Sequence, residues 1–137
     1  MHLIVGGKYM GKLSYARRLY GEDASVCDLA AAELKEIFAA QISVNLQDGV
    51  KWLLEQGESP LDFFEANLGR LADKILIGDE VGSGLVPADP FERLWRDETG
   101  RLYQLLAAQA SLVDRVWAGL PRRLKDGVVN IGRKNSE

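Results

Sequence analysis

The chain has 137 residues, 47% of them hydrophobic, and its 17 basic and 20 acidic residues give a formal net charge of −3. This length corresponds to one domain, and a weak, mixed charge gives no bulk attraction to nucleic acid or to an anionic membrane. The single cysteine, Cys27, excludes an internal disulfide and a cysteine-based zinc site; without a basic, apolar leader, the sequence predicts a cytoplasmic protein.

Short apolar runs alternate with longer segments of helical period, which predicts an α/β fold with a mostly parallel sheet. The predicted strands are residues 2–5, 25–27, 75–77 and 115–118. The predicted helices are residues 11–20, 42–54, 61–71 and 90–111, the second starting its apolar stripe at Ile42 and the last burying Leu94, Leu102 and Leu106. Residues 28–40 are also helix-prone. Residues 1–125 are predicted to form the domain, followed by a polar tail over 126–137 with an edge strand at 128–129.

A glycine-rich segment joins the first strand to the first helix. It has the spacing G-x-x-x-x-G-K in a strand-loop-helix context, in which backbone N–H groups surround phosphate oxygens. Lys12 is predicted to reach the β- and γ-phosphates as a catalytic residue. The predicted nucleotide-binding residues are Gly6, Gly7, Lys8, Tyr9, Met10, Gly11, Lys12 and Leu13. The alternative is a glycine turn that only caps the helix.

Leu13 stands where such loops carry a serine or threonine whose hydroxyl binds Mg²⁺. A leucine cannot coordinate a cation. Ser14 is one position further along, where a helix turns the side chain by about 100°. A loop that binds phosphate and catalyses poorly is therefore an intermediate interpretation.

Two acids, Asp79 and Glu80, follow the predicted strand at 75–77. Ligands bind at the carboxyl ends of strands in open α/β sheets, so either acid is a predicted Mg²⁺ ligand. Glu80 is also a predicted catalytic residue that places the metal or the acceptor. The alternative is that both acids cap a glycine-rich turn. His2, the one histidine, is expected to be a structural or terminal residue.

Four segments resemble the bifunctional adenosylcobinamide kinase / adenosylcobinamide-phosphate guanylyltransferase family of cobalamin biosynthesis. Besides the loop, residues 79–87 resemble its Asn-Glu-Val-Gly-x-Gly-Ile-Val-Pro signature, with Asp79 in place of Asn. Residues 93–104 match its Arg-x-(aromatic)-Arg-Asp-x-x-Gly-Arg-x-x-Gln helix, and residues 118–125 match Ala-Gly-(Ile/Leu)-Pro-x-x-Leu-Lys. The chain thus resembles a short, divergent member.

The resemblance implies a three-layer P-loop NTPase-like fold that binds ATP or GTP with Mg²⁺ and phosphorylates the aminopropanol hydroxyl of a corrinoid. It also implies a homo-oligomer, and substrate or subunit contacts for Arg93, Arg96 and Arg101. The alternative for this helix is a solvated face with ion pairs four residues apart.

The family's second activity passes through a guanylylated histidine, and residues 28–73 contain no histidine. We therefore expect a kinase without guanylyltransferase activity. The alternative, which also accounts for Leu13, is a nucleotide- or corrinoid-binding protein that keeps the fold without its catalysis.

Overall fold

The computed structural model describes residues 1–82 and 89–127, so the edge strand predicted at 128–129 lies outside the described residues. In chain order the elements are β1 (His2–Gly6), α1 (Lys12–Tyr20), β2 (Val26–Asp28), the 3₁₀ helix η1 (Leu34–Phe38), β3 (Ile42–Val44), α2 (Leu46–Glu55), α3 (Pro60–Ala66), the 3₁₀ helix η2 (Leu68–Leu71), β4 (Ile75–Asp79), α4 (Pro90–Gln109), β5 (Leu112–Trp117) and β6 (Leu120–Asp126).

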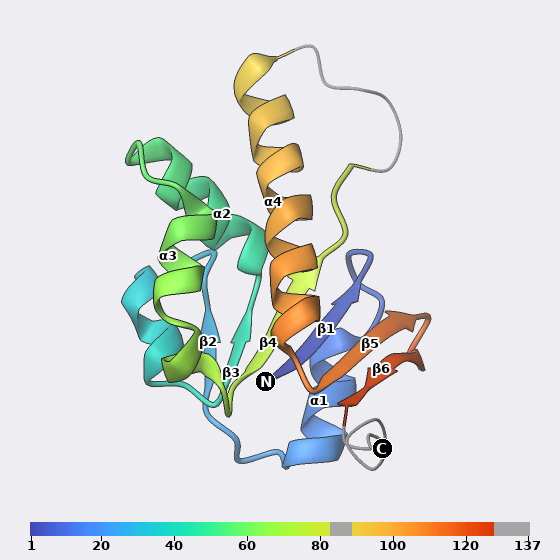
Figure 1. Cartoon of the computed structure of the whole chain (residues 1–137). Helices are drawn as coiled ribbons and strands as arrows, with labels where there is room; N and C mark the ends of the chain where they lie inside the picture. The colour runs from blue at the N-terminus through green and yellow to red at the C-terminus, as the bar shows by residue number, and fades with distance from the viewer. Residues whose placement is uncertain (83–88, 128–137) are drawn as a thin grey trace, which may run out of the picture.

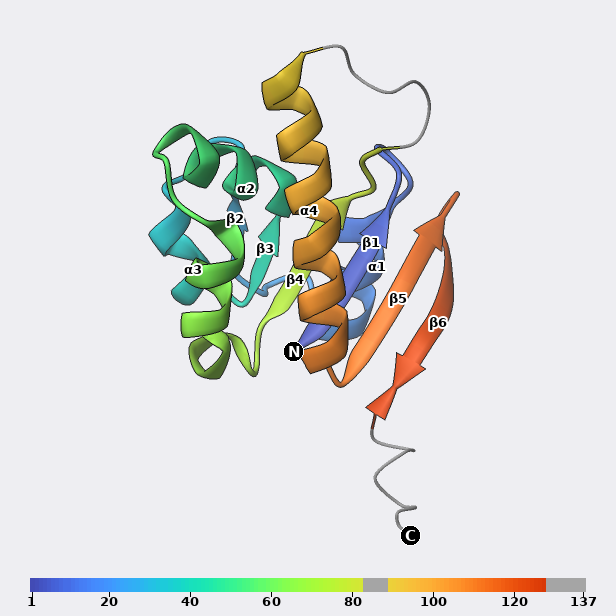
Figure 2. The ribbon, with the colours of Figure 1, turned by 45° about the horizontal axis from the view of Figure 1, so that its top comes forward.

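The strands form one sheet in the order β2-β3-β4-β1-β5-β6 (Figure 1). All neighbouring pairs are parallel except β5 and β6, which form an antiparallel hairpin at one side of the sheet (Figure 2). The predicted α/β class with a mostly parallel sheet is confirmed. In this register Gly6, the last residue of β1, lies beside Asp79, the last residue of β4. The two predicted site segments therefore leave the same edge of the sheet.

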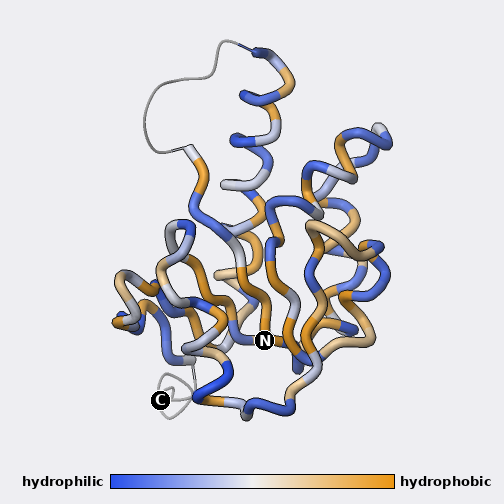
Figure 3. Tube along the Cα trace, turned by 180° about the vertical axis from the view of Figure 1, so that it is seen from behind, coloured by the Kyte–Doolittle hydropathy of each residue, from blue (hydrophilic) through white to orange (hydrophobic). Residues whose placement is uncertain are grey.

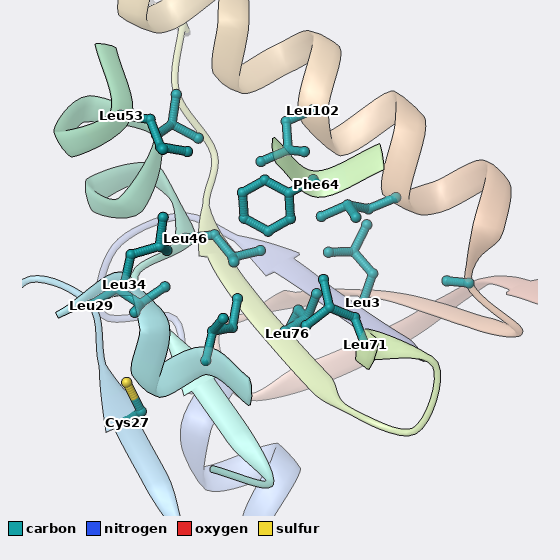
Figure 4. Close-up of a cluster of buried hydrophobic side chains, with 14 of the residues drawn as sticks. Leu3, Cys27, Leu29, Leu34, Leu46, Leu53, Phe64, Leu71, Leu76 and Leu102 are labelled. Atoms are coloured by element: carbon teal, nitrogen blue, oxygen red, sulfur yellow. The ribbon is translucent and has the colours of Figure 1, made fainter. Parts of the chain in front are cut away.

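Helices cover both faces, which makes the predicted three-layer fold. Successive residues of β1 face opposite sides: Leu3 belongs to the core beneath α2, α3 and α4, and Ile4 to the core beneath α1. Phe64 of α3 lies in the middle of the larger core, near Leu46 and Leu102 (Figure 4). Seen from behind, much of the trace through the centre of the molecule is coloured as hydrophobic (Figure 3).

Two of the predicted helical segments are wrong, and one further strand was not predicted. Ile42 does not begin a helix, because Ile42–Val44 is a buried strand between β2 and β4, and Asn45, at φ 63°, turns the chain into α2. Residues 28–40 contain only the short 3₁₀ helix η1. The sequence reading also missed β6, which is exposed along most of its length and so lacks an alternating apolar pattern; pairing with β5 defines it.

Helix α4 projects beyond the sheet at its N-terminal end (Figure 1). This explains why Leu94 is exposed, contrary to the prediction, whereas Leu102 and Leu106 are fully buried further along. No helix among the described residues is long and apolar enough to cross a membrane.

Candidate functional site

The loop between β1 and α1 has the geometry of a turn built on glycine. Gly11 immediately precedes α1 at φ 92°, a conformation that side chains disfavour, and Tyr9 also has a positive φ, at 63°. The backbone N–H of Gly119, in the β5–β6 turn, donates to the carbonyl of Met10 over 2.8 Å. No described residue accepts a hydrogen bond from the backbone N–H groups of residues 8–13, so these donors are available to a ligand.

Lys12, the first residue of α1, is buried to 8% exposure, which is unusual for a lysine. Its ammonium Nζ donates to the carbonyl of Gly7 over 2.7 Å and lies 2.8 Å from Oδ1 of Asp79. The ion pair joins the loop to the end of β4. A cationic group is thus fixed inside the curve of the loop.

Asp79 is held from three sides. Its backbone N–H donates to the side-chain carbonyl of Gln47 over 2.8 Å, and the amide of Gln47 donates to its Oδ2 over 3.2 Å. The hydroxyl of Tyr103, on α4, donates to its carbonyl over 2.6 Å. This contact requires glycine at position 78, where a Cβ atom would lie 2.2 Å from the Tyr103 oxygen. Burial raises the pKa of Tyr103, so the phenol keeps its proton.

Glu80 continues the chain away from the sheet, and its backbone N–H donates to the carbonyl of Gly6 over 2.8 Å. Arg115 of β5 holds its carboxylate, with Nε 2.6 Å from Oε2 and the terminal nitrogen Nη2 3.1 Å from Oε1. The carboxylate is thus committed to an ion pair at the margin of the site.

Lys12, Asp79 and Glu80 line a cleft of about 710 Å³ at the carboxyl edge of the sheet. It brings together most of the predicted loop, namely Lys8, Tyr9, Met10, Gly11, Lys12 and Leu13, with Asp79 and Glu80. Gly6, the last residue of β1, and Gly7, which follows it, are outside the lining of the cleft. A cationic lysine, free N–H donors and the N-terminus of α1 make this a cleft suited to phosphate groups.

The opposite wall was missed by the sequence analysis. It is formed by Asn45, Gln47 and Asp48 at the start of α2 and by Trp95 of α4, whose indole N–H donates to the carbonyl of Gln47 over 2.7 Å. The signal was present: polar residues that directly follow a β-branched run, as Asn45 follows Ile42–Val44, mark the end of a parallel strand. Assigning Ile42 to a helix hid it.

The carboxylate of Asp48 has a perturbed environment. Burial raises its pKa, and the nearby charges of Asp28 and Asp79 raise it further, against the opposing effect of Lys51 and Lys8. Such a carboxylate on a cleft wall is a stronger proton acceptor than an exposed one.

The residues around the loop fit a Mg²⁺ ion carried by a nucleotide better than a site made by protein alone. The described residues contain no group of three His, Cys, Asp or Glu side chains that could hold a metal. Mg²⁺ commonly binds through one or two carboxylates together with substrate phosphates and water, and Asp79 supplies such a carboxylate. Leu13 lines the cleft without a hydroxyl, and Ser14, which also lines it, brings one nearby.

The three arginines predicted for substrate or subunit contacts lie on α4, outside the described lining of the cleft. Arg96 is partly buried 3.8 Å from Asp97, and Arg101 is mostly exposed and paired with Glu98 over 2.5 Å. Arg93 is exposed near the N-terminal end of the helix.

His2 lies at the other end of β1, buried away from the cleft. Its Nε2 is 2.6 Å from Oδ2 of Asp114, and its Nδ1 is 2.6 Å from the hydroxyl of Tyr20. Burial lowers the pKa of His2, although the hydrogen bond that its ring makes to the Asp114 carboxylate acts in the opposite direction. Both ring nitrogens are engaged, as expected of a structural histidine.

Comparison with known protein families gives a match over the second half of the chain. The model of the family described as cobinamide kinase / cobinamide phosphate guanyltransferase matches residues 55–124, just over half of the chain. The match covers β4, α4 and most of the β5–β6 hairpin, and with them Asp79 and Glu80, but it does not extend to the loop that holds Lys12. A search of curated proteins finds no match.

Proposed function

The chain belongs to the cobinamide kinase / cobinamide phosphate guanyltransferase family, and from this premise we propose that it is a nucleotide-dependent kinase acting on the hydroxyl of a cobinamide. One observation carries the proposal. The glycine-rich loop with Lys12 and the family-matched residues Asp79 and Glu80, far apart in sequence, line one cleft.

Lys12 neutralises phosphate charge in this mechanism. Its ammonium is already held inside the loop by the Gly7 carbonyl and by Asp79, so little reorganisation is needed when a triphosphate enters. The free N–H donors of residues 8–13 bind phosphate oxygens, and the α1 N-terminus adds partial positive charge. Phosphoryl transfer depends mainly on such positioning and electrostatic stabilisation.

Asp79 is the residue that would hold a nucleotide-borne Mg²⁺, with Glu80 as the second candidate. When bound, Mg²⁺ neutralises charge on the transferring phosphoryl group. Gln47 and Tyr103 orient Asp79 for this role. Arg115 keeps the Glu80 carboxylate at the cleft margin, where the ion pair positions it beside the loop.

The guanylyl-transfer activity is not part of the proposal. A covalent nucleotidyl intermediate needs an accessible nucleophile, and the one histidine of the sequence is buried against Asp114 and Tyr20 at the opposite end of β1. ATP and GTP are both candidate phosphoryl donors for the kinase reaction.

A binding protein without catalysis is the second candidate, and Leu13 favours it. Without the loop hydroxyl, nucleotide affinity would change little when Mg²⁺ is removed, and no phosphorylated product would form. A kinase requires Mg²⁺ for turnover.

The family resemblance also implies self-association, and the exposed edge strand β6 is the surface that favours it. No described strand pairs with its outer edge, and Trp117, Leu120 and Leu124 of the hairpin are each more than half exposed. Light scattering of the full chain should show an oligomer, which Leu120→Asp with Leu124→Asp should dissociate. A monomeric wild type would contradict this part of the proposal.

The central experiment incubates the purified full chain with adenosylcobinamide, Mg²⁺ and either ATP or GTP, and follows the corrinoid phosphate by mass spectrometry. Calorimetric titration with each nucleotide, with and without Mg²⁺, runs in parallel. Product formation supports the kinase; nucleotide binding without product supports the second candidate. Neither binding nor product would contradict both.

A further inference from the structure

A second hollow, of about 610 Å³, lies next to the cleft on the side of α2. One wall is the segment from Leu29 to Lys35, and the other is the face of α2 that carries Trp52. The two approach closely because position 49 is glycine: a Cβ atom there would lie 3.2 Å from Leu34 and 3.4 Å from Leu29. Leu29 and Leu34 lie side by side at the margin of the main core (Figure 4).

The hollow combines an apolar floor with a charged rim. Phe38 and Phe63, whose ring centroids are 6.1 Å apart, contribute to its lining. Trp52 also lines the hollow and is 49% exposed, although half of the residues of α2 are buried. Lysines and glutamates, which carry opposite charges, also line the hollow. This combination suits a large ligand with an apolar face and a polar periphery.

The hollow adjoins the cleft. Ala30 and Asp48 line both. Asp48 is next to Gln47, which holds Asp79, so the junction lies on the wall facing Lys12 and the loop. A ligand seated in the hollow would extend a substituent past Asp48 toward the place proposed for the terminal phosphate.

Resting on the proposed function, we propose that this hollow binds the corrin body of cobinamide, and that Asp48 at the junction accepts a hydrogen bond from the hydroxyl to be phosphorylated. The corrin macrocycle is broad and largely apolar, and its amide side chains provide the polar periphery that the charged rim fits. Trp52 supplies an exposed aromatic surface for the ring. The nucleotide and the acceptor thus occupy adjoining hollows with separate walls.

Equilibrium dialysis of cobinamide against the nucleotide-free full chain tests the site, because corrin absorbance reports the bound fraction. Ala31→Trp should fill the hollow from an exposed position and weaken cobinamide affinity about tenfold or more, and Trp52→Ala should weaken it several-fold. Ala39→Trp is the matched control: it adds the same side chain at another exposed alanine, outside both hollows. Affinity equal to wild type in Ala31→Trp would overturn the assignment, as would displacement of cobinamide by nucleotide.

Asp48→Asn tests the second half of the proposal. The substitution should lower kcat for cobinamide phosphorylation about tenfold while changing cobinamide affinity little, because the hydroxyl contact is one of many. An unchanged kcat would overturn this role. The outcomes separate the two proposals: nucleotide affinity and product formation in the wild type test the kinase, whereas the Ala31→Trp and Ala39→Trp pair tests the hollow. A wild type that forms product with an unchanged KM in Ala31→Trp would leave the kinase standing and remove the hollow.

Discussion

Two ion pairs beside β1 each contain a mostly buried carboxylate but have different surroundings. At the carboxyl end, Lys12 pairs with Asp79 beside an open cleft. Toward the amino end, Asp114 accepts from Arg123 over 2.6 Å and from Tyr15 over 2.8 Å, and contacts His2. The Lys12–Asp79 pair joins elements that are distant in sequence, whereas Asp114 and Arg123 lie on the consecutive strands β5 and β6, and it is His2 and Tyr15 that connect this pair to distant elements.

The difference between them is access. His2, Tyr15 and Arg123 all hydrogen-bond to Asp114, and the cluster ties α1, β1, β5 and β6 together. Around Lys12 the neighbouring backbone N–H groups are free of described partners and face a cleft. Burial and charge pairing alone therefore do not identify a functional site; unsatisfied donors next to an accessible volume do.

The largest expected effect is on stability, from Asp114→Ala. The substitution leaves Arg123, His2 and Tyr15 without their shared acceptor, which should lower the free energy of unfolding by about 3–5 kcal/mol. Urea unfolding measures the change. Asp126→Ala, which removes only the more exposed, 3.4 Å partner of Arg123, is the control and should cost less than about 1 kcal/mol. Similar losses in both variants would show that the Asp114 cluster is not a structural tie.

Lys12→Ala should act on function more than on folding. Removing the ammonium should weaken triphosphate affinity or turnover by about 100-fold or more, by loss of charge complementary to the phosphates. Calorimetry with ATP and GTP measures it. Lys8→Ala, at an exposed position lining the same cleft, is the matched control and should change affinity much less. An equal effect of the two would mean that only overall charge matters at the loop.

Leu13→Ser should make nucleotide binding depend more strongly on Mg²⁺. The added hydroxyl lies at the position that binds Mg²⁺ in loops of this spacing, so the ratio of nucleotide affinities with and without Mg²⁺ should rise about tenfold. Leu13→Ala controls for the lost side chain, which packs partly against the smaller core. If both variants behave alike, the missing hydroxyl does not determine the metal dependence.

The smallest expected effect is the pH dependence contributed by His2. Because burial lowers its pKa below 6.5, the unfolded chain binds a proton near that pH while the folded chain does not. Stability should therefore fall as pH drops from 7.5 through 6.5 to 5.5. Urea unfolding at these pH values compares the wild type with His2→Gln.

His2→Gln should be less stable than the wild type at every pH. Its free energy of unfolding should change less with pH over this range, because the variant lacks the titrating ring. Hydrogen bonds from Arg123, Tyr15 and His2 hold the pKa of Asp114 below its usual value although burial alone would raise it, so its own contribution is lost only at lower pH. Parallel profiles in the two proteins would assign the slope to other groups.

Local patterns were sufficient for much of the fold. Short β-branched runs predicted β1, β2 and β4, and the Ser59-Pro60 pair predicted the start of α3, where the Ser59 hydroxyl accepts from the N–H of Asp62. The prediction failed at β3, because three residues are too few to show a strand period and Ile42 lies four before Leu46, a helical spacing. It failed at β6 because an exposed edge strand has no buried face to leave a pattern.

The sequence by itself determined the α/β class, the loop with Lys12 and the acids that follow β4, since glycine spacing and strand ends are local chemistry. Only the tertiary structure decided that Lys12 pairs with Asp79, that Gln47, Asp48 and Trp95 form the facing wall, and that Glu80 is held by Arg115. The physical reason is that strand order sets which loops meet. β4 lies between β3 and β1, and this order places three segments far apart in the chain around one cleft.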